Sequence, residues 1–382
     1  MSVTSHGQKF AAPRTDAQGR IPLIGLSMPE MIEALAIHEL PKFRAAQVWN
    51  WIYHRGVTSF EAMANLPKEM RQLLSDYYSI ERPRVVTEQK SEDGTIKWLL
   101  AMSDGQQVEA VFIPEAERGT LCISSQVGCT LTCKFCHTGT QPLVRNLGAH
   151  EILQQIMHAR DALSEWPQVG GKGENESRDL TNIVLMGMGE PLYNYENVAK
   201  AMTIAMDENG LGISKRRITL STSGVVPLIK KVGDELGVNL AISLHAPTDE
   251  KRASIMPINN KYPLTELLQA CRDYPINSTQ RRITFEYVML ADVNDTDEDA
   301  ETLATILKDI PCKVNLIPFN AWPGSDYTCS SGNRMHKFAK ILTSRGLDAP
   351  IRKPRGRDIL AACGQLKSAS KRLKSAISGG LE

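Results

Sequence analysis

Three cysteines in one short segment are the residues of this chain best suited to metal chemistry. Cys129, Cys133 and Cys136 have the spacing Cys-x3-Cys-x2-Cys. A structural zinc site takes four ligands, and an ordinary iron–sulfur cluster takes four cysteines. Three thiolates on a four-iron cluster leave one iron without a protein ligand, so a small molecule can bind there. The spacing therefore favours a reactive cluster over a structural metal site.

A zinc site with His137 as fourth ligand is the alternative for this segment. Because Cys136 and His137 are adjacent, their side chains would close poorly around one tetrahedral ion. A non-catalytic zinc or iron–sulfur RNA-binding protein also stays open on this segment alone. The iron, sulfide and zinc content of the protein would separate these alternatives.

A second group of candidate residues lies where strand-like segments end. Glycines in the run from Met186 to Pro191 allow close approach of the backbone to a ligand, and Glu190 can accept from an ammonium group. Other polar residues at such ends are Gly189, Ser221, Ser243, His245 and Asn320. Any one of them, taken alone, is also explained as a turn or capping residue.

Six strand-like segments alternate with six helix-like segments after residue 117. The strands are expected at Thr120–Ser124, Ile183–Met186, Arg217–Leu220, Val238–Ser243, Ile283–Val288 and Lys313–Ile317. The helices are expected at His150–Leu163, Tyr195–Asp207, Pro227–Leu236, Leu264–Arg272, Glu298–Lys308 and Met335–Thr343. This order predicts an α/β fold, a partial parallel (β/α)6 barrel, whose strands end on one face. The candidate residues would then meet on that face.

The whole chain divides into five predicted parts. They are a disordered N-terminus (1–20), a helical accessory domain (21–83), a short β extension or linker region (84–117), the partial barrel (118–350) and a basic C-terminal segment (351–382). Helices are expected at Leu26–Leu40, Phe43–Tyr53 and Ser59–Leu74, and strands at 85–87, 96–101 and 108–113. Residues 168–179 are expected to form a mobile polar loop. The aromatic residues Trp49, Trp51 and Tyr53 favour a small helical core, although such a module also suits RNA binding.

Composition indicates a soluble enzyme. The 382 residues are 42% hydrophobic and 23% charged, and no apolar run reaches the length of about 18 residues that a membrane helix needs. The polar start lacks a signal segment, so we expect a cytoplasmic protein without membrane contact. Eight unevenly spaced cysteines favour metal or redox chemistry over a disulfide framework.

Basic residues cluster in three places, although the net charge is only +1. The clusters are Lys215–Arg217, Arg281–Arg282 and the run from Arg352 to Lys374. Such clusters suit phosphate contacts, with a solvated surface as the alternative. Pro354 and Gly356 make the start of the last run a loop rather than a helix face.

The cysteine motif after the first barrel strand, with Phe135 before the third cysteine, resembles the radical S-adenosylmethionine (SAM) superfamily. The resemblance implies one 4Fe-4S cluster on Cys129, Cys133 and Cys136. SAM would bind the open iron, and its reductive cleavage would give a 5′-deoxyadenosyl radical. The implied SAM contacts are Gly189, Glu190, Ser221, Ser243, Leu244, His245 and Asn320.

Two further cysteines narrow the resemblance. Cys122 precedes the cluster motif, and Cys363 follows the basic loop 352–358. Together they make the chain similar, from Phe43 to Gln365, to the radical SAM RNA methyl synthases that methylate C2 of adenine. Cys271, Cys312 and Cys329 match no motif, and we interpret them as plain thiols. Plain buried thiols are also the alternative for Cys122 and Cys363.

The resemblance implies a ping-pong route with two SAM molecules per turnover. Adenine C2 is electrophilic, so a carbon radical can add to it where SN2 transfer from SAM would fail. Cys363 would carry the methyl as S-methylcysteine, and its thiolate would gain from cations at 352–357. Glu109 would accept the C2 proton, since a carboxylate on a half-buried strand gains a raised pKa. Cys122 would then attack Cys363, leaving a transient disulfide.

The implied partners are 23S rRNA and tRNA, with an external, flavodoxin-like electron donor. The target adenosines would lie in the peptidyl-transferase centre and 3′ of the anticodon. A related activity methylates C8 of the same base, and Pro191-Leu192 after Glu190 favours C2. We expect a monomer.

Overall fold

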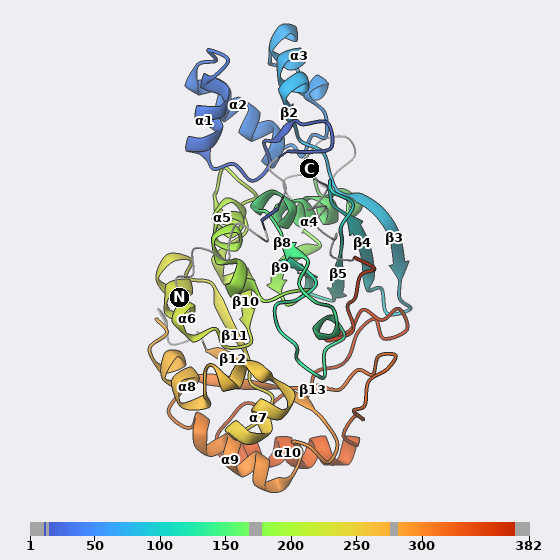
Figure 1. Ribbon diagram of the computed structural model, residues 1–382, viewed down its shortest axis with the longest axis vertical. Helices are drawn as coiled ribbons and strands as arrows, with labels where there is room; N and C mark the ends of the chain where they lie inside the picture. The colour runs from blue at the N-terminus through green and yellow to red at the C-terminus, as the bar shows by residue number, and fades with distance from the viewer. Residues whose placement is uncertain (1–10, 13–14, 168–177, 276–281, 371–382) are drawn as a thin grey trace, which may run out of the picture.

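The computed structural model describes residues 11–12, 15–167, 178–275 and 282–370. Most of the segment 1–20 predicted to be disordered lies outside these ranges, and its described end forms a turn in which Asp16 binds Arg20. The predicted mobile loop 168–179 lies outside the described residues except for its last two. Helices α1–α3 lie at one end of the long axis of the molecule and α9 and α10 at the other (Figure 1).

One nine-stranded sheet forms the centre of the fold, in the order β13-β12-β11-β10-β9-β6-β5-β4-β3. Strands β6 and β9–β13 are parallel neighbours, as the alternation predicted. The strands are β3 Arg84–Lys90, β4 Ile96–Ala101, β5 Gln107–Glu115, β6 Arg118–Cys122, β9 Leu180–Leu185, β10 Ile218–Thr222, β11 Asn239–Ser243, β12 Ile283–Met289 and β13 Cys312–Pro318. Among the described strands, β13 and β3 each pair on one side only, so the barrel is partial.

Helices connect the parallel strands. They are α4 Ala149–Ala162, α5 Tyr195–Met206, α6 Val226–Glu235, α7 Asp249–Ile255, α8 Leu264–Arg272, α9 Asp297–Leu307 and α10 Gly332–Ser344, with 3-10 turns η4 Thr138–Thr140, η5 Pro191–Asn194, η6 Lys215–Arg217 and η7 Pro257–Asn260. Helix α7 was not predicted. No helix in the described part of the chain combines the length and apolar character that a membrane span requires.

The helical module packs its aromatic residues inward. It contains α1 Met28–Ala36, α2 Lys42–Tyr53, η3 Phe60–Ala62 and α3 Lys68–Tyr77, and the short strands β1 Ile21–Pro22 and β2 Tyr78–Ser79 pair in parallel at its base. A capping box between Ser27 and Glu30 starts α1, which satisfies its first N–H groups. The Trp49 indole donates to the carbonyl of Asn209, so this core also joins the module to the barrel.

The β extension continues the barrel sheet instead of standing apart from it. Strands β3, β4 and β5 form antiparallel pairs that lead directly into β6. The C-terminal segment lies across these strands: Asp358 accepts from Ser91, Asp93 accepts from the N–H of Gly356, and Lys97 donates to the carbonyl of Leu360. The extension therefore serves as the platform for the segment that carries Cys363.

Candidate active site

A cavity lies at the carboxyl ends of the parallel strands, where the sequence placed the candidate residues. It encloses about 990 Å³, including its open mouth. Its lining includes Cys129, Cys133, Cys136, Gly189, Glu190, Ser221, Ser243, His245, Glu286, Arg352 and Cys363. The structure thus brings the three motif cysteines together with most of the residues proposed to contact SAM.

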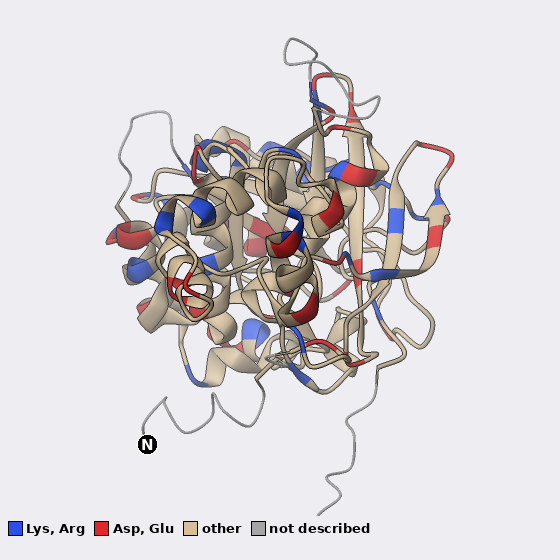
Figure 2. Ribbon diagram, turned by 90° about the horizontal axis from the view of Figure 1, so that it is seen from above, with Lys and Arg blue, Asp and Glu red and all other residues tan. Residues whose placement is uncertain are grey.

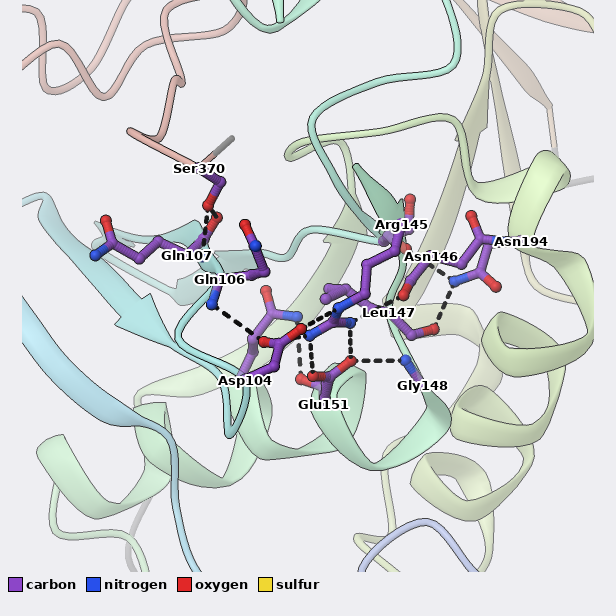
Figure 3. A network of polar contacts seen from close by, with 12 residues as sticks. Asp104, Gln106, Gln107, Arg145, Asn146, Leu147, Gly148, Glu151, Asn194 and Ser370 are labelled. Carbon is purple, nitrogen blue, oxygen red and sulfur yellow. Dashed lines mark hydrogen bonds and ion pairs between the residues drawn. The ribbon is translucent and has the colours of Figure 1, made fainter. Parts of the chain in front are cut away.

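The loop that carries the three cysteines is held at both ends. Strands β7 Gln126–Val127 and β8 Arg145–Asn146 pair in front of α4. The buried guanidinium of Arg145 makes paired contacts of 2.7–2.8 Å with Asp104, from the β4–β5 turn, and with Glu151, in the first turn of α4 (Figure 3). Because Glu151 also accepts from the N–H of Gly148, one ionic network fixes the loop against the sheet and the helix.

The three thiols form a donor set that fits a cluster with one open iron. Burial raises the pKa of each of them, to about 12 for Cys133, so they need a metal to hold them as thiolates. No three His, Cys, Asp or Glu side chains in the described ranges are already drawn around one point as metal ligands. The thiols share one buried cavity, and a cluster bound there would need each of them to turn toward it.

His137 is directed elsewhere, which disfavours it as a zinc ligand. Its ring stacks on Trp322 with centroids 4.7 Å apart, and its Nδ1 lies 3.3 Å from the carbonyl oxygen of Gln365. The ring does not belong to the lining of the cavity that the three cysteines share. The alternative of a zinc knuckle that includes His137 therefore finds no support in the geometry.

Glu190 is buried with its carboxylate held in place. Its Oε1 accepts from the N–H of Leu192 at 3.1 Å and its Oε2 from that of Ser223 at 2.8 Å. Burial raises the pKa of Glu190, and each carboxylate oxygen keeps a further lone pair for an ammonium donor. Gly189 before it has φ +101°, and a Cβ there would lie 2.5 Å from the Cβ of Gln126. Only glycine fits at that position.

His245 lines the cavity as a neutral imidazole. Its Nδ1 accepts from the N–H of Val288 at 3.0 Å, which leaves the proton on Nε2. Burial, with Arg252 nearby, lowers its pKa to about 3. Ser221 and Ser243 line the same cavity from the ends of β10 and β11.

Leu244 and Asn320 lie differently from the other proposed SAM contacts. Leu244 is fully buried, and its backbone N–H donates a hydrogen bond to the carbonyl of Glu286. Asn320 lines a second cavity and donates to the carbonyl oxygen of Cys363 at 3.3 Å, while its Oδ1 accepts from Arg357. Asn320 therefore supports the Cys363 loop in this structure.

The second cavity lies between Cys122 and Cys363. It encloses about 1740 Å³ and is lined by both Cys122 and Cys363, whereas Cys363 also lines the first cavity. Burial, and then the nearby Cys363, raises the pKa of Cys122 to about 12. Cys363 is an exposed residue, yet the protein around its thiol raises its pKa while Arg352 acts in the opposite direction. Desolvation therefore outweighs the lowering of the Cys363 pKa that we expected from the basic loop.

The segment around Cys363 is tied directly to the cysteine loop. The N–H of His137 donates to the carbonyl of Gly364 at 2.7 Å, and the Thr138 hydroxyl donates to that of Leu366 at 2.6 Å. The Gln365 side chain donates to the carbonyl of Ala321 at 2.7 Å. These bonds explain why Cys363, more than 220 residues after the motif, lies over the same cavity.

Glu109 is buried on β5 but lines neither cavity. Its Oε1 lies 3.1 Å from Nζ of Lys97, and its Oε2 accepts from the N–H of Lys367 at 2.8 Å. Burial raises its pKa, as a base at neutral pH requires, while Lys97 opposes that rise. Glu109 therefore binds the same segment that carries Cys363.

Sequence reasoning missed two buried residues of the site. Arg252, on the unpredicted α7, donates to the carbonyls of Ser223, Ser243 and Leu244 and so ties the loops of the cavity rim together. Glu286 lines both cavities from the middle of β12. A lone glutamate in an apolar strand was a signal for Glu286, as it was for Glu109, whereas nothing in the sequence marks Arg252.

The basic clusters combine internal contacts with exposed cations. Arg352 lies 3.9 Å from Glu286, Arg355 lies 3.9 Å from Asp93, and Arg357 donates to Asn320. Exposed members of the clusters are Lys215–Arg217, Arg282, Lys353 and Arg357. Figure 2 shows Lys and Arg mixed with Asp and Glu over most of the described part. Arg281 and the last cations of the C-terminal run lie outside the described residues. Phosphate contacts by these clusters stay a prediction.

Comparison with known proteins assigns two segments of the chain to known families. Residues 123–304 match the family model of the radical SAM superfamily, and residues 21–80 match the ribosomal RNA large subunit methyltransferase N-terminal domain. The dual-specificity RNA methyltransferase RlmN of Rhodospirillum rubrum is 57% identical over 98% of this chain and 86% of its own. That of Parvibaculum lavamentivorans is 58% identical over 95% of this chain and 93% of its own.

A solved structure agrees with these sequence matches. A radical SAM methyltransferase from Sphaerobacter thermophilus has a TM-score of 0.83 and 43% identity, covering 91% of this chain and 99% of its own. The resemblance to the RNA methyl synthases is thereby confirmed, and with it a radical SAM fold that uses a 4Fe-4S cluster and SAM. The chain therefore belongs to the RlmN family of dual-specificity RNA methyltransferases.

Proposed function

We propose that this protein methylates C2 of adenosine in 23S rRNA and in tRNA, with Cys363 as the carrier of the methyl group. One observation carries the proposal: Cys363 lies between the cavity of the three cluster thiols and the cavity that holds Cys122. A residue that first receives a methyl beside SAM and later forms a disulfide must reach both places. The names of the most similar proteins support RNA as the substrate.

Cys129, Cys133 and Cys136 would hold the cluster, and Glu190 with Gly189, Ser221, Ser243 and His245 would hold SAM. When bound, the cluster supplies the electron that splits SAM and starts radical chemistry. Glu190 is oriented for the amino group of SAM because two backbone N–H groups fix its carboxylate. The neutral His245 presents an Nε2–H donor to the same cavity.

The two cysteines would divide the group transfer between them. The Cys363 sulfur takes the methyl of one SAM, and a hydrogen removed from that methyl gives the carbon radical that adds to C2. Glu109 accepts the proton that C2 loses, which requires the segment 364–367 to release its carboxylate. The adduct radical must also give up one electron, which would return to the oxidised cluster. Attack of Cys122 on the Cys363 sulfur then breaks the bond from that sulfur to the methylene carbon, which takes up a proton to become the methyl group of the base. A Cys122–Cys363 disulfide remains, which a thiol must reduce.

The remaining parts of the proposal concern partners. We assign RNA contacts to the helical module 21–83, because its family model belongs to ribosomal RNA methyltransferases. The target base must leave its stack to reach the cavity, as for other enzymes that modify bases. We propose a cytoplasmic monomer, organised in the five parts given above, that takes electrons from an external flavodoxin-like donor.

Nucleoside mass spectrometry tests the proposal directly. The protein, reconstituted with iron and sulfide under anaerobic conditions, is incubated with SAM, a reductant and unmodified 23S rRNA or tRNA. We expect 2-methyladenosine from the unaltered protein and none from Cys363→Ala. Formation of 8-methyladenosine would contradict the assigned position, and methylation by Cys363→Ala would contradict the role of the carrier cysteine.

A further inference from the structure

Glu286 is a buried carboxylate that the proposed function leaves unused. It lies in the middle of β12 with 4% of its surface exposed, and it lines both cavities. Its Oε1 accepts from the Asn315 amide at 3.0 Å and lies 3.9 Å from Nη1 of Arg352. Its Oε2 is buried and has no hydrogen-bond partner among the described residues. A buried carboxylate oxygen without a partner is costly, so it calls for a function.

Cys363 shares these surroundings. It lines the same two cavities as Glu286 and Arg352. Burial raises the pKa of Glu286 and that of Cys363, and each of the two acids feels the same guanidinium. Lys313, further along β13, adds a weaker positive charge, and Cys122 faces the second cavity as a protonated thiol.

Two acidic groups beside one guanidinium favour a single negative charge between them. Charging both would leave an unbalanced anion in a desolvated place, and charging neither would leave Arg352 with only the smaller effect of Glu115 to balance it. A proton that moves from Cys363 to Glu286 keeps the total charge of the group constant. The site is thus arranged for proton transfer between these two side chains.

Methylation of a thiol requires the thiol to lose its proton. We propose that Oε2 of Glu286 accepts the Cys363 proton while the sulfur attacks the methyl group of SAM. A bond forms between Sγ and the methyl carbon, and the bond from that carbon to the sulfonium breaks. Its electron pair stays on the sulfur of S-adenosylhomocysteine. This inference rests on the proposed function, because it supplies the base for its first step.

The other acids and bases around the two cavities are less suitable. Glu190 already accepts from two backbone N–H groups, and His245 has its accepting nitrogen occupied. Glu115, at the edge of the second cavity, pairs with Arg118. Among the described carboxylates that line the cavities, Glu286 is the one with a buried oxygen that has no hydrogen-bond partner.

The rate of Cys363 methylation tests the inference. The reconstituted protein is mixed with SAM in the absence of RNA, and S-methylation of the Cys363 peptide is followed by mass spectrometry from pH 6 to 9.5. Glu286→Gln keeps the shape of the side chain but removes the base, so methylation at pH 7 should fall about 100-fold. The residual rate should rise about tenfold per pH unit, because it then depends on free thiolate. Glu266→Gln, an exposed glutamate in the first turn of α8 and outside both cavities, is the control and should behave like the unaltered protein.

A second measurement separates a base from damage to the site. Free thiolate needs no base, and a rise of about tenfold per pH unit closes a 100-fold gap by about pH 9, so the methylation rate of Glu286→Gln should approach that of the unaltered protein at the upper end of the pH range. Binding of SAM, measured by equilibrium dialysis, should stay within about threefold of the unaltered protein, because Glu286 is not among the proposed SAM contacts.

Four results would overturn the inference. An unchanged methylation rate and pH profile in Glu286→Gln would show that another group takes the proton. A methylation rate that stays low at pH 9.5 would show a distorted cavity instead of a missing base, and so would a large loss of SAM binding. If the unaltered protein never forms S-methylcysteine at position 363, the proposed function fails first and the inference fails with it.

Discussion

Replacement of Gly189 by alanine tests the geometry of the SAM pocket most sharply. The backbone there has φ +101°, and a Cβ would meet Gln126 at 2.5 Å from its Cβ, 2.7 Å from its Cγ and 2.8 Å from its backbone nitrogen. Backbone atoms and the stem of Gln126 cannot rotate away, so the loop after β9 that carries Gly189 must move away from strand β7. Gly189→Ala therefore strains the backbone and also displaces a side chain.

Displacement of Gln126 reaches the residue that we assign to the SAM amino group. Its Oε1 accepts from the N–H of Glu190 at 3.0 Å, and its amide bonds Thr130 in the cysteine loop and Asn146 in β8. The positive φ costs a residue with a Cβ about 1–3 kcal/mol. One or two lost hydrogen bonds add about 1 kcal/mol each. The free energy of unfolding should fall by about 2–5 kcal/mol in total, by the sum of these two effects.

Displacement of Glu190 should also weaken the binding of SAM. A loss of about 1–2 kcal/mol at the pocket weakens binding roughly 5- to 30-fold. Gly105→Ala is the matched control, because Gly105 has φ +79° but no atom within 4 Å of the position that a Cβ would take. It should lose only the backbone contribution of about 1–3 kcal/mol and keep its SAM affinity.

The assay combines urea unfolding with equilibrium dialysis of labelled SAM on the reconstituted proteins. We expect Gly189→Ala to lose both stability and SAM affinity, and Gly105→Ala to lose stability alone. If Gly189→Ala bound SAM as tightly as the unaltered protein, the argument that this close approach positions Glu190 would be refuted.

Three further changes address other parts of the site. Cys129→Ala should lose its iron and sulfide and all RNA methylation, whereas the exposed Cys329→Ala should keep both; iron analysis would expose a wrong ligand assignment if the first variant still bound a full cluster. Glu109→Gln should accumulate a protein–RNA adduct and slow its release by about 100-fold or more, as seen on denaturing gels, and normal release would remove Glu109 as the base. Arg252→Met should lower the free energy of unfolding by about 2–4 kcal/mol, because three loop carbonyls lose a buried donor; a neutral result in urea unfolding would contradict its role in the rim.

The sheet was predictable from sequence because its strands are short apolar runs that end in polar or glycine residues. Strand β12, for example, was expected at Ile283–Val288 and is found at Ile283–Met289. Helix α7 was missed because seven residues give too little periodicity to recognise. Arg252, which lies on α7, was therefore not considered either. Its role depends on contacts between loops that are far apart in the sequence.

Motif residues at strand ends were equally predictable in position, since parallel strands end on one face. Their partners were not, because contacts between distant segments depend on packing. The burial of Glu109 followed from its apolar neighbours on β5, but its contacts with Lys97 and Lys367 did not. The contact of Arg352 with Glu286 was likewise not predictable, since Glu286 lies on β12, far away in the sequence.

The central claim is that Cys363 carries the methyl group to RNA and Cys122 releases the product. Its most direct test is Cys122→Ala, incubated with SAM, reductant and unmodified 23S rRNA and then digested for mass spectrometry. The account predicts a stable covalent adduct in which the Cys363 sulfur is joined through one methylene carbon to adenine C2. Free methylated RNA at the normal rate, with no RNA attached to Cys363, would contradict it.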